Sequence, residues 1–260
     1  MSETHVLVHP DPPQLAEAVA ARLLARLAEL QSQRGRASLI LAGGGVVIDS
    51  LAAVRESSAR DAVDWGAIDV WWSDERFLPA GHPERNALQA QRALLDTLSL
   101  DPGRVHPMPA AGADLSGPEL SAAAEDAAAA YAAELAASAP PSSELPQFDV
   151  LLLGMGGEGH TASIFPESPA VYDTRVVTAV HGCPKPPPTR ITFTLPTIRT
   201  AEEVWILTAG EGKAPAVGLA LQGAGETQIP VAGARGQRRT MWFLDRAAAT
   251  EVPNELRTPW

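Results

Sequence analysis

FDVLLLGMGGEGH (148–160) is the stretch that decides the fold, because a continuous apolar run ends there in a turn built from four glycines. A run without polar alternation is typical of a strand that is covered on both faces, as in a parallel sheet. The same arrangement occurs in SLILA (38–42), which leads directly into Gly43, Gly44 and Gly45. Both segments predict strands of an α/β sheet, each followed by an unusual loop.

Strand-like and helix-like segments alternate along nearly the whole chain. Further strands are predicted at HVLVH (5–9), IDVWWS (68–73), RITFTL (190–195), 203–208 and TMWFL (240–244). Helices are predicted from Leu15 to Leu30, after Gly45 to about Ser57, from about Glu84 to Leu98, as peripheral packing within 110–146, and from Glu211 onward. Because no repeat or linker-joined module interrupts this order, we predict one domain, 1–260.

The charge of the chain restricts the classes of partner. There are 20 Lys and Arg residues against 31 Asp and Glu residues, a net charge of -11, which opposes broad contact with nucleic acid or anionic lipid. An anionic metabolite is compatible only with a pocket that concentrates Arg and Lys. We expect a small-molecule ligand and no nucleic-acid, membrane or obligate protein partner.

Cysteine content and the first residues indicate the compartment. Cys183 is the single cysteine, so an internal disulfide is excluded. The start MSETHVLVHP lacks the basic flank and apolar run of a signal peptide, and no apolar stretch reaches the roughly 18 to 20 residues of a membrane helix. These features predict a cytoplasmic protein.

Several unusual loops should meet at one edge of the sheet. In an open α/β sheet, ligands bind beyond the carboxyl ends of the strands, and the segments 43–45, 74–76, 154–160 and 210–213 all follow predicted strands. The three glycines at 43–45 precede a helix, so their backbone N–H groups could cradle a phosphate. A plain tight turn explains the same glycines equally well.

The turn after residue 154 presents Glu158 and His160 at this edge. A neutral imidazole, with a reference pKa of about 6.5, can accept and release a proton at cellular pH. A lone histidine is more often structural, but this glycine-rich setting favours proton transfer.

The charged residues near the other loops can be interpreted in two ways. Asp74, Glu75 and Arg76 could form a solvated turn, and Arg190 and Lys213 could be surface charges. Together with the glycine loop, however, the cations would supply the positive site that an acidic protein needs for phosphate.

Other hydrolytic chemistries lack their sequence signals. The histidines have no zinc-protease spacing, so we predict no required metal. No G-x-S-x-G segment occurs, and Ser163 has no motif of its own, which argues against a serine hydrolase.

Taken together, five segments resemble the successive motifs of the 6-phosphogluconolactonase family, in that family's order. They are LAGGGVVIDSL, WWSDERFLP, GMGGEGHTASIFP, RITFTLPTI and GEGKAPAV, from about residue 38 to 217. The resemblance implies a three-layer α/β/α sandwich with a mostly parallel, Rossmann-like sheet. It also implies a hydrolase without cofactor that converts 6-phospho-D-glucono-1,5-lactone to 6-phospho-D-gluconate in the oxidative pentose phosphate pathway.

The resemblance implies a role for each matching residue. His160 matches the general base, with Glu158, Asp74 and Arg76 as the other catalytic candidates. The positions that match substrate or phosphate binding are Gly43, Gly44, Gly45, Glu75, Asn86, Arg190 and Lys213.

The chain departs from the family pattern at three places. Gly45-Val46 stands where a Ser or Thr hydroxyl is usual, Glu158 stands where Asp is usual, and Arg85-Asn86 replaces a Ser-Asn pair. Arg85 could supply compensating positive charge to the substrate.

Two other functions remain open on this scaffold. A 6-phosphosugar isomerase or deaminase would use His160 and an acid to move protons between C1 and C2. A non-enzymatic sugar-phosphate sensor would keep the phosphate-binding positions without needing His160.

Overall fold

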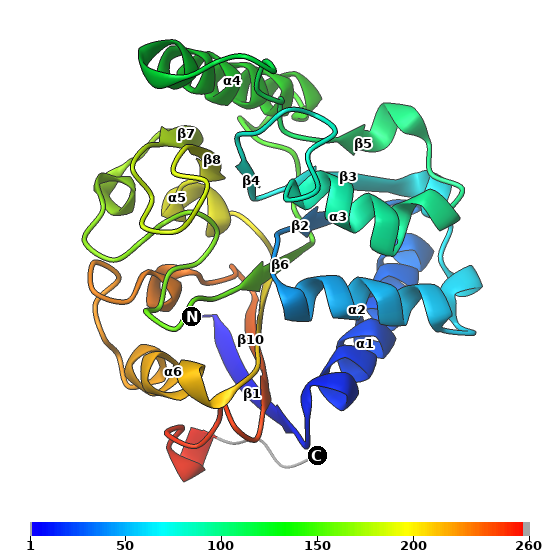
Figure 1. Cartoon of the computed structure of the whole chain (residues 1–260). Helices are drawn as coiled ribbons and strands as arrows, with labels where there is room; N and C mark the ends of the chain where they lie inside the picture. Colours follow the sequence, from blue (N-terminus) through cyan, green and yellow to red (C-terminus); the bar gives the residue numbers. More distant parts are fainter. Residues whose placement is uncertain (1, 257–260) are drawn as a thin grey trace.

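The computed structural model describes residues 2–256 and contains a sheet of seven strands that all pair in parallel (Figure 1). The strand order is β1-β10-β9-β6-β2-β3-β5. In that order the strands span Glu3–His9, Arg239–Asp245, Glu203–Thr208, Val150–Gly154, Ala37–Leu41, Ile68–Trp72 and Val105–His106. The central strands are buried along almost their whole length, which explains their uninterrupted apolar sequences.

Helices cover both faces of this sheet, and the predicted three-layer α/β/α sandwich is confirmed (Figure 1). In Figure 1, α1 and α2 lie on one side and α6 lies on the other. The helices are α1 (Pro12–Arg34), α2 (Gly45–Glu56), α3 (Asn86–Ala93), α4 (Gly117–Ser138), α5 (Leu195–Ile198) and α6 (Ala214–Leu221). Within residues 2–256, no helix combines the length and the apolar character needed to cross a membrane.

Local sequence signals set the ends of α1. The side chain of Asp11 accepts a hydrogen bond from the Gln14 backbone N–H at 2.9 Å, and Pro12 occupies the first helical position. Gly35 ends the helix with a φ of 75°, a conformation that glycine adopts without steric cost. The apolar face between these ends is buried, as the periodicity predicts.

A second, antiparallel sheet was not predicted. It consists of β4 (Asp74–Arg76), β8 (Arg190–Phe193) and β7 (Val177–Val180) in the order β4-β8-β7. The charged triplet is therefore a strand and not a turn. The predicted strand 190–195 stops at Phe193, because α5 begins at Leu195.

Ser73 alone separates β3 from β4, so the chain passes from one sheet to the other within one residue. Its N–H and its hydroxyl both donate to the carbonyl of Leu41 in β2, at 2.8 and 3.1 Å. Its own carbonyl accepts from the N–H of Phe193 in β8, at 2.7 Å. Ser73 thereby ties the two sheets together.

Two predicted helices differ from the structure. The helix expected from about Glu84 to Leu98 is shorter, since α3 ends at Ala93 and a 3-10 turn follows. The helix expected as peripheral packing, α4, is anchored by Tyr131, whose hydroxyl accepts from the Trp72 N–H and donates to the His106 carbonyl, both at 3.0 Å. Nearly all buried apolar residues of the described chain join in one cluster, which supports our proposal of a single domain.

Candidate active site

A cavity of about 460 Å³ lies at the carboxyl ends of β2, β6 and β9, beside β4 and β8. The predicted site residues that line it are Gly43, Gly44, Gly45, Asp74, Arg76, Asn86, His160, Arg190 and Lys213. Glu75 and Glu158 are not part of the lining. The loops that follow separate strands thus meet, as the rule for open α/β sheets predicts.

The glycine loop forms the wall of the cavity next to α2. Gly44 has a φ of 112°, in the region that favours glycine, and no side chain of the described residues caps the first turn of α2. The N–H groups at this helix end are therefore available to an anion. At Gly43, a Cβ atom would come within 2.7 Å of Cγ of Asn86, so the close packing of these two residues requires glycine.

His160 and Glu158 are brought together by the next glycine turn. Oε1 of Glu158 lies 3.0 Å from Nδ1 of His160. A Cβ atom on Gly156 would fall well inside 3.0 Å of both side chains, so a larger residue could not occupy this position without moving them. The imidazole also stacks on Phe165, with ring centroids 4.4 Å apart.

The carboxylate of Glu158 determines which nitrogen of His160 is basic. A carboxylate beside Nδ1 favours the tautomer with its proton on Nδ1 and leaves the lone pair on Nε2. Burial lowers the pKa of His160, and the Lys185 ammonium acts in the same direction, against Glu158 and Asp74. His160 is therefore neutral, and able to accept a proton, at neutral pH.

Glu158 itself stays ionised. Partial burial would raise its pKa, but the hydrogen bond from Lys185 and the neighbouring His160 outweigh this and lower the pKa of Glu158 to about 2. The carboxylate is then a permanent negative charge behind the imidazole.

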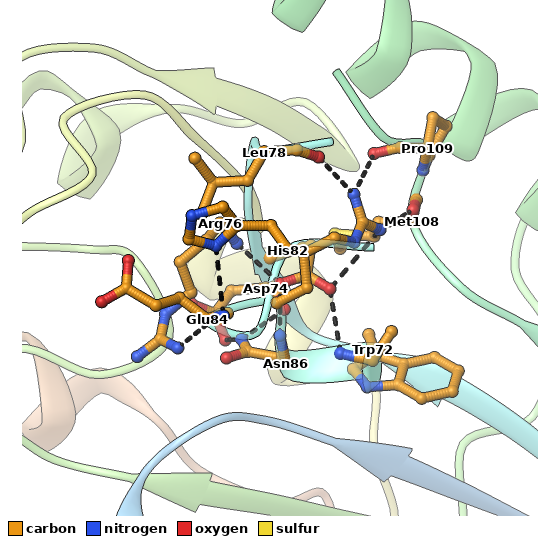
Figure 2. Close-up of polar contacts among 12 residues, drawn as sticks. Trp72, Asp74, Arg76, Leu78, His82, Glu84, Asn86, Met108 and Pro109 are labelled. Atoms are coloured by element: carbon orange, nitrogen blue, oxygen red, sulfur yellow. Dashed lines mark hydrogen bonds and ion pairs between the residues drawn. The ribbon is translucent and has the colours of Figure 1, made fainter. Parts of the chain in front are cut away.

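Asp74 is held in a fixed position at the floor of the cavity. Its Oδ2 accepts from the Ser163 hydroxyl at 2.7 Å. Its Oδ1 accepts from the Asn86 side-chain amide at 3.1 Å (Figure 2). The same amide donates to the Asp74 carbonyl at 2.9 Å. Each carboxylate oxygen has a second lone pair, so Asp74 can still accept from a ligand hydroxyl.

Arg76 extends along the rim beside this network. Its Nη1 donates to the carbonyl of Glu84, which leaves the other guanidinium donors available to the cavity that it lines (Figure 2). Its strand partner in the register of β4 and β8 is Arg190. Two guanidinium groups thus come from adjacent positions of the small sheet.

Glu75, which we expected to contact substrate, is instead fully buried outside the cavity. Its carboxylate accepts from the backbone N–H groups of Asn86 at 2.6 Å and Ala87 at 2.9 Å, at the start of α3. Burial raises the pKa of Glu75, against the opposing effect of Arg85 and these N–H groups. Glu75 thus positions Asn86 and does not face the ligand.

Arg85 does not supply charge to the cavity either. Its guanidinium is buried and donates to the carbonyls of Leu78, Met108 and Pro109, at 2.6 to 3.3 Å. It also pairs with Glu75 at 3.5 Å. Arg85 therefore holds the segment after β4 and is not available to a ligand in the cavity.

Three further cations line the same cavity: Arg190, Lys213 and Lys185. Arg190 is buried, and its Nε and Nη2 donate to carbonyls of residues 185–187, which leaves Nη1 for a ligand. Burial lowers the pKa of Lys213, and the ammonium of Lys185 lowers it further. Like charges held this close favour an anion between them.

Three residues at this site were missed in the sequence. Lys185 lies in a Pro-rich segment with no periodic pattern, and Ser163 lies within a motif but carries no signal of its own. Thr208, at the end of β9, lines the cavity with a buried hydroxyl that has no partner among the described residues. Only its position after a predicted strand could have indicated Thr208.

A second cavity, also of about 460 Å³, lies at the amino ends of β2 and β3. Its positive charges are largely neutralised within the protein, since Arg34 pairs with Asp149 and Arg104 pairs with Asp69. The cavity at the carboxyl ends is therefore the candidate active site.

A model of the family described as glucosamine-6-phosphate isomerases/6-phosphogluconolactonase matches residues 10–242. The chain belongs to this family. Among curated members, the 6-phosphogluconolactonase of Streptomyces coelicolor is 55% identical, covering 100% of this chain and 99% of its own. The 6-phosphogluconolactonase of Mycobacterium tuberculosis is 45% identical, covering 95% and 98% respectively.

Solved structures agree with the family assignment. The 6-phosphogluconolactonase of Trypanosoma brucei superposes with a TM-score of 0.84 at 28% identity, covering 97% of this chain and 100% of that one. Of the positions at which the chain departs from the motifs quoted above, Glu158 contacts both His160 and Lys185, and Thr208 lines the same cavity as the glycine loop.

Proposed function

We propose that this protein is a 6-phosphogluconolactonase that hydrolyses 6-phospho-D-glucono-1,5-lactone to 6-phospho-D-gluconate, with His160 as the general base. The names of the relatives support the reaction. The observation that carries the proposal is the distribution of charge in one cavity: His160 and Asp74 line it together with Arg190, Lys213 and the open end of α2. A phosphorylated lactone carries a reactive carbon and a dianion, and the cavity offers a base for the first and cations with free N–H groups for the second.

The reaction begins with proton transfer to His160. Nε2 of the neutral imidazole removes a proton from water while the water oxygen attacks C1, and the carbonyl electron pair moves to the oxygen. Glu158, ionised beside Nδ1, stabilises the imidazolium that forms. Positioned proton transfer of this kind contributes roughly 10²- to 10⁴-fold in rate.

The tetrahedral intermediate then collapses. The bond from C1 to the ring oxygen breaks, and the imidazolium returns its proton to that oxygen, which becomes the hydroxyl at C5. The product carboxyl releases its proton to solvent. Arg76 is the side chain that we assign to the developing oxyanion, because it lines the cavity from the β4 edge with guanidinium donors to spare.

The remaining groups hold the substrate. We assign the phosphate to the N–H groups around Gly43–Gly45, to Nη1 of Arg190, to Lys213 and to the hydroxyl of Thr208. Asp74 and Asn86 are assigned to sugar hydroxyls. Fixing the far end orients C1 at His160, a term that reaches roughly 7 to 11 kcal/mol in the best cases.

The proposal places the reaction in the oxidative pentose phosphate pathway and in the cytoplasm. It requires neither a metal nor an organic cofactor, because an activated lactone needs only a base and charge stabilisation.

The decisive experiment compares wild type with His160→Ala on freshly generated lactone, after subtraction of spontaneous hydrolysis. We expect the variant to lose at least about a hundredfold in kcat. Glucosamine-6-phosphate is assayed in parallel, where ammonia release would indicate a deaminase. A wild-type rate equal to background would refute the lactonase, and full activity of His160→Ala would refute the base.

A further inference from the structure

Lys185 is a charged side chain at the cavity for which the reaction described above has no role. It lies in the segment PKPPP (184–188), lines the cavity, and has a side chain that is 46% exposed. Its Nζ is 2.7 Å from Oε1 and 2.8 Å from Oε2 of Glu158. Both carboxylate oxygens are thus engaged by a single ammonium.

The ion pair contacts the Nδ1 side of the His160 imidazole. The oxygen Oε1 of Glu158 that contacts Lys185 is the same oxygen that lies 3.0 Å from Nδ1 of His160. Lys185 and His160 therefore share one carboxylate. The ammonium partly cancels the negative charge that the imidazole would otherwise experience.

The backbone of Lys185 is fixed by hydrogen bonds, while its half-exposed side chain is held by Glu158. Nη2 of Arg190 donates to the carbonyls of Lys185 and Pro186, both at 3.1 Å, and Nε donates to that of Pro187 at 3.2 Å. The flexible four-carbon stem of Lys185 starts from this anchored segment, next to the cations that we assign to phosphate.

The neighbouring charges favour movement of the ammonium when an anion binds. Lys185 and Lys213 are close enough for the one to lower the pKa of the other. This repulsion is relieved if a phosphate dianion lies between them. A dianion also competes with the single charge of Glu158 for the same ammonium.

We propose that Lys185 is a positioning residue of this reaction, which pairs with Glu158 in the empty enzyme and transfers its ammonium to the phosphate of the bound substrate. The inference rests on the proposed function for the identity of that substrate. On transfer, Glu158 keeps His160 as its side-chain partner within residues 2–256, and the base becomes stronger in the complex than in the free enzyme.

The charges that act on His160 determine the sign of the effect. Glu158 and Asp74 raise its pKa, while burial and Lys185 lower it. Removing the Lys185 charge, or moving it to a ligand, therefore raises the pKa of His160. Arg190 and Lys213 face the same cavity but remain in place in both states of this scheme.

The first test is an NMR titration of the His160 imidazole in the full chain, assigned with His160→Gln. Wild type, Lys185→Met and Lys185→Arg are each titrated with and without sulfate, which stays a dianion throughout. Without sulfate, we expect the His160 midpoint to lie about one pH unit higher in Lys185→Met than in wild type. Sulfate should then raise the midpoint more in wild type and in Lys185→Arg than in Lys185→Met.

Glu158→Gln supplies the matched control. If Lys185 acts through Glu158, then adding Lys185→Met to Glu158→Gln should change the His160 midpoint much less than it does in wild type. Lys185 is exposed, so its substitution is expected to leave the melting temperature unchanged. An equal effect of Lys185→Met in both backgrounds would overturn the role of Glu158.

The second test is kinetic. In Lys185→Met, the acid limb of kcat/KM should move to higher pH while the acid limb of kcat stays in place, and KM should rise about tenfold. A raised KM with an unchanged His160 midpoint would reduce Lys185 to a phosphate ligand and refute the positioning role. If wild type lacked lactonase activity, the proposed function would fail, but the titration with sulfate would still decide the role of Lys185.

Discussion

Gly156→Ala should inactivate the protein without unfolding it. The added Cβ would fall well inside 3.0 Å of Nδ1 of His160 and of the Glu158 carboxylate. Ordinary van der Waals contact begins at 3.4 Å, so the imidazole must withdraw by about 1 Å, a displacement that can cost a hundredfold in rate. We therefore expect kcat to fall about a hundredfold, which corresponds to about 2.7 kcal/mol of activation free energy. KM should change little, because the phosphate end is untouched.

Stability should fall only modestly. Gly156 has no positive φ, so alanine suits its backbone and restricts the unfolded chain by about 0.4 to 1 kcal/mol, which partly offsets the roughly 1 to 3 kcal/mol cost of displacing His160 and Glu158. The assay is steady-state lactone hydrolysis combined with thermal unfolding. The exposed Gly225→Ala is the control, since its Cβ would meet no atom within 4 Å. Full kcat in Gly156→Ala would refute the requirement for a fixed imidazole, and a collapse of its melting temperature would show that the glycine serves folding.

Three further predictions address other parts of the site. Thr208→Val should raise KM about tenfold with kcat unchanged, because the hydrogen bond from its hydroxyl to the phosphate is lost. It should also raise the melting temperature, because a buried hydroxyl without a partner among the described residues is removed. An unchanged KM would exclude Thr208 from phosphate binding. Since burial lowers the pKa of His160, the acid inflection of kcat/KM should lie below pH 6.5, the ordinary value for histidine; an inflection above 6.5 would contradict this sign. Arg85→Met should lower the free energy of unfolding by about 3 to 5 kcal/mol, because it leaves Glu75 buried without its cation. KM should stay within about twofold of wild type in the fraction that folds. A stable variant with a much higher KM would show that Arg85 binds the substrate.

The parallel sheet can be predicted from the sequence because its strands are buried on both faces. Segments such as SLILA (38–42) and FDVLLLG (148–154) do not alternate between polar and apolar residues, and each leads into a glycine-rich loop. The carboxyl-edge rule then places their loops together without any knowledge of distances. This is why most of the predicted residues line one cavity.

The small sheet carries no comparable signal. Asp74, Glu75 and Arg76 form a three-residue strand whose side chains are all charged, so the usual period of two in hydropathy is absent. Only pairing with β8 makes this segment a strand. The three side chains also point in different directions: Asp74 and Arg76 line the cavity, and Glu75 accepts from the backbone at the start of α3.

Contacts between distant segments explain the other omissions. Lys185 is 27 residues from Glu158 in sequence, and nothing in a Pro-rich segment indicates which carboxylate its side chain meets. The same holds for Arg85, whose partners are backbone carbonyls that carry no residue identity. Sequence patterns indicate the burial of an element more clearly than the direction of one polar side chain.

The joint at Ser73 has a consequence for how the protein meets its substrate. One wall of the cavity belongs to the large sheet and the other to the small one, and strands β3 and β4 of the two sheets are joined by a single buried residue that is hydrogen-bonded to both. Such a connection prevents the two walls from moving apart as hinged domains do. The cavity should therefore keep one shape with and without substrate, so that little of the binding free energy is lost in ordering the site.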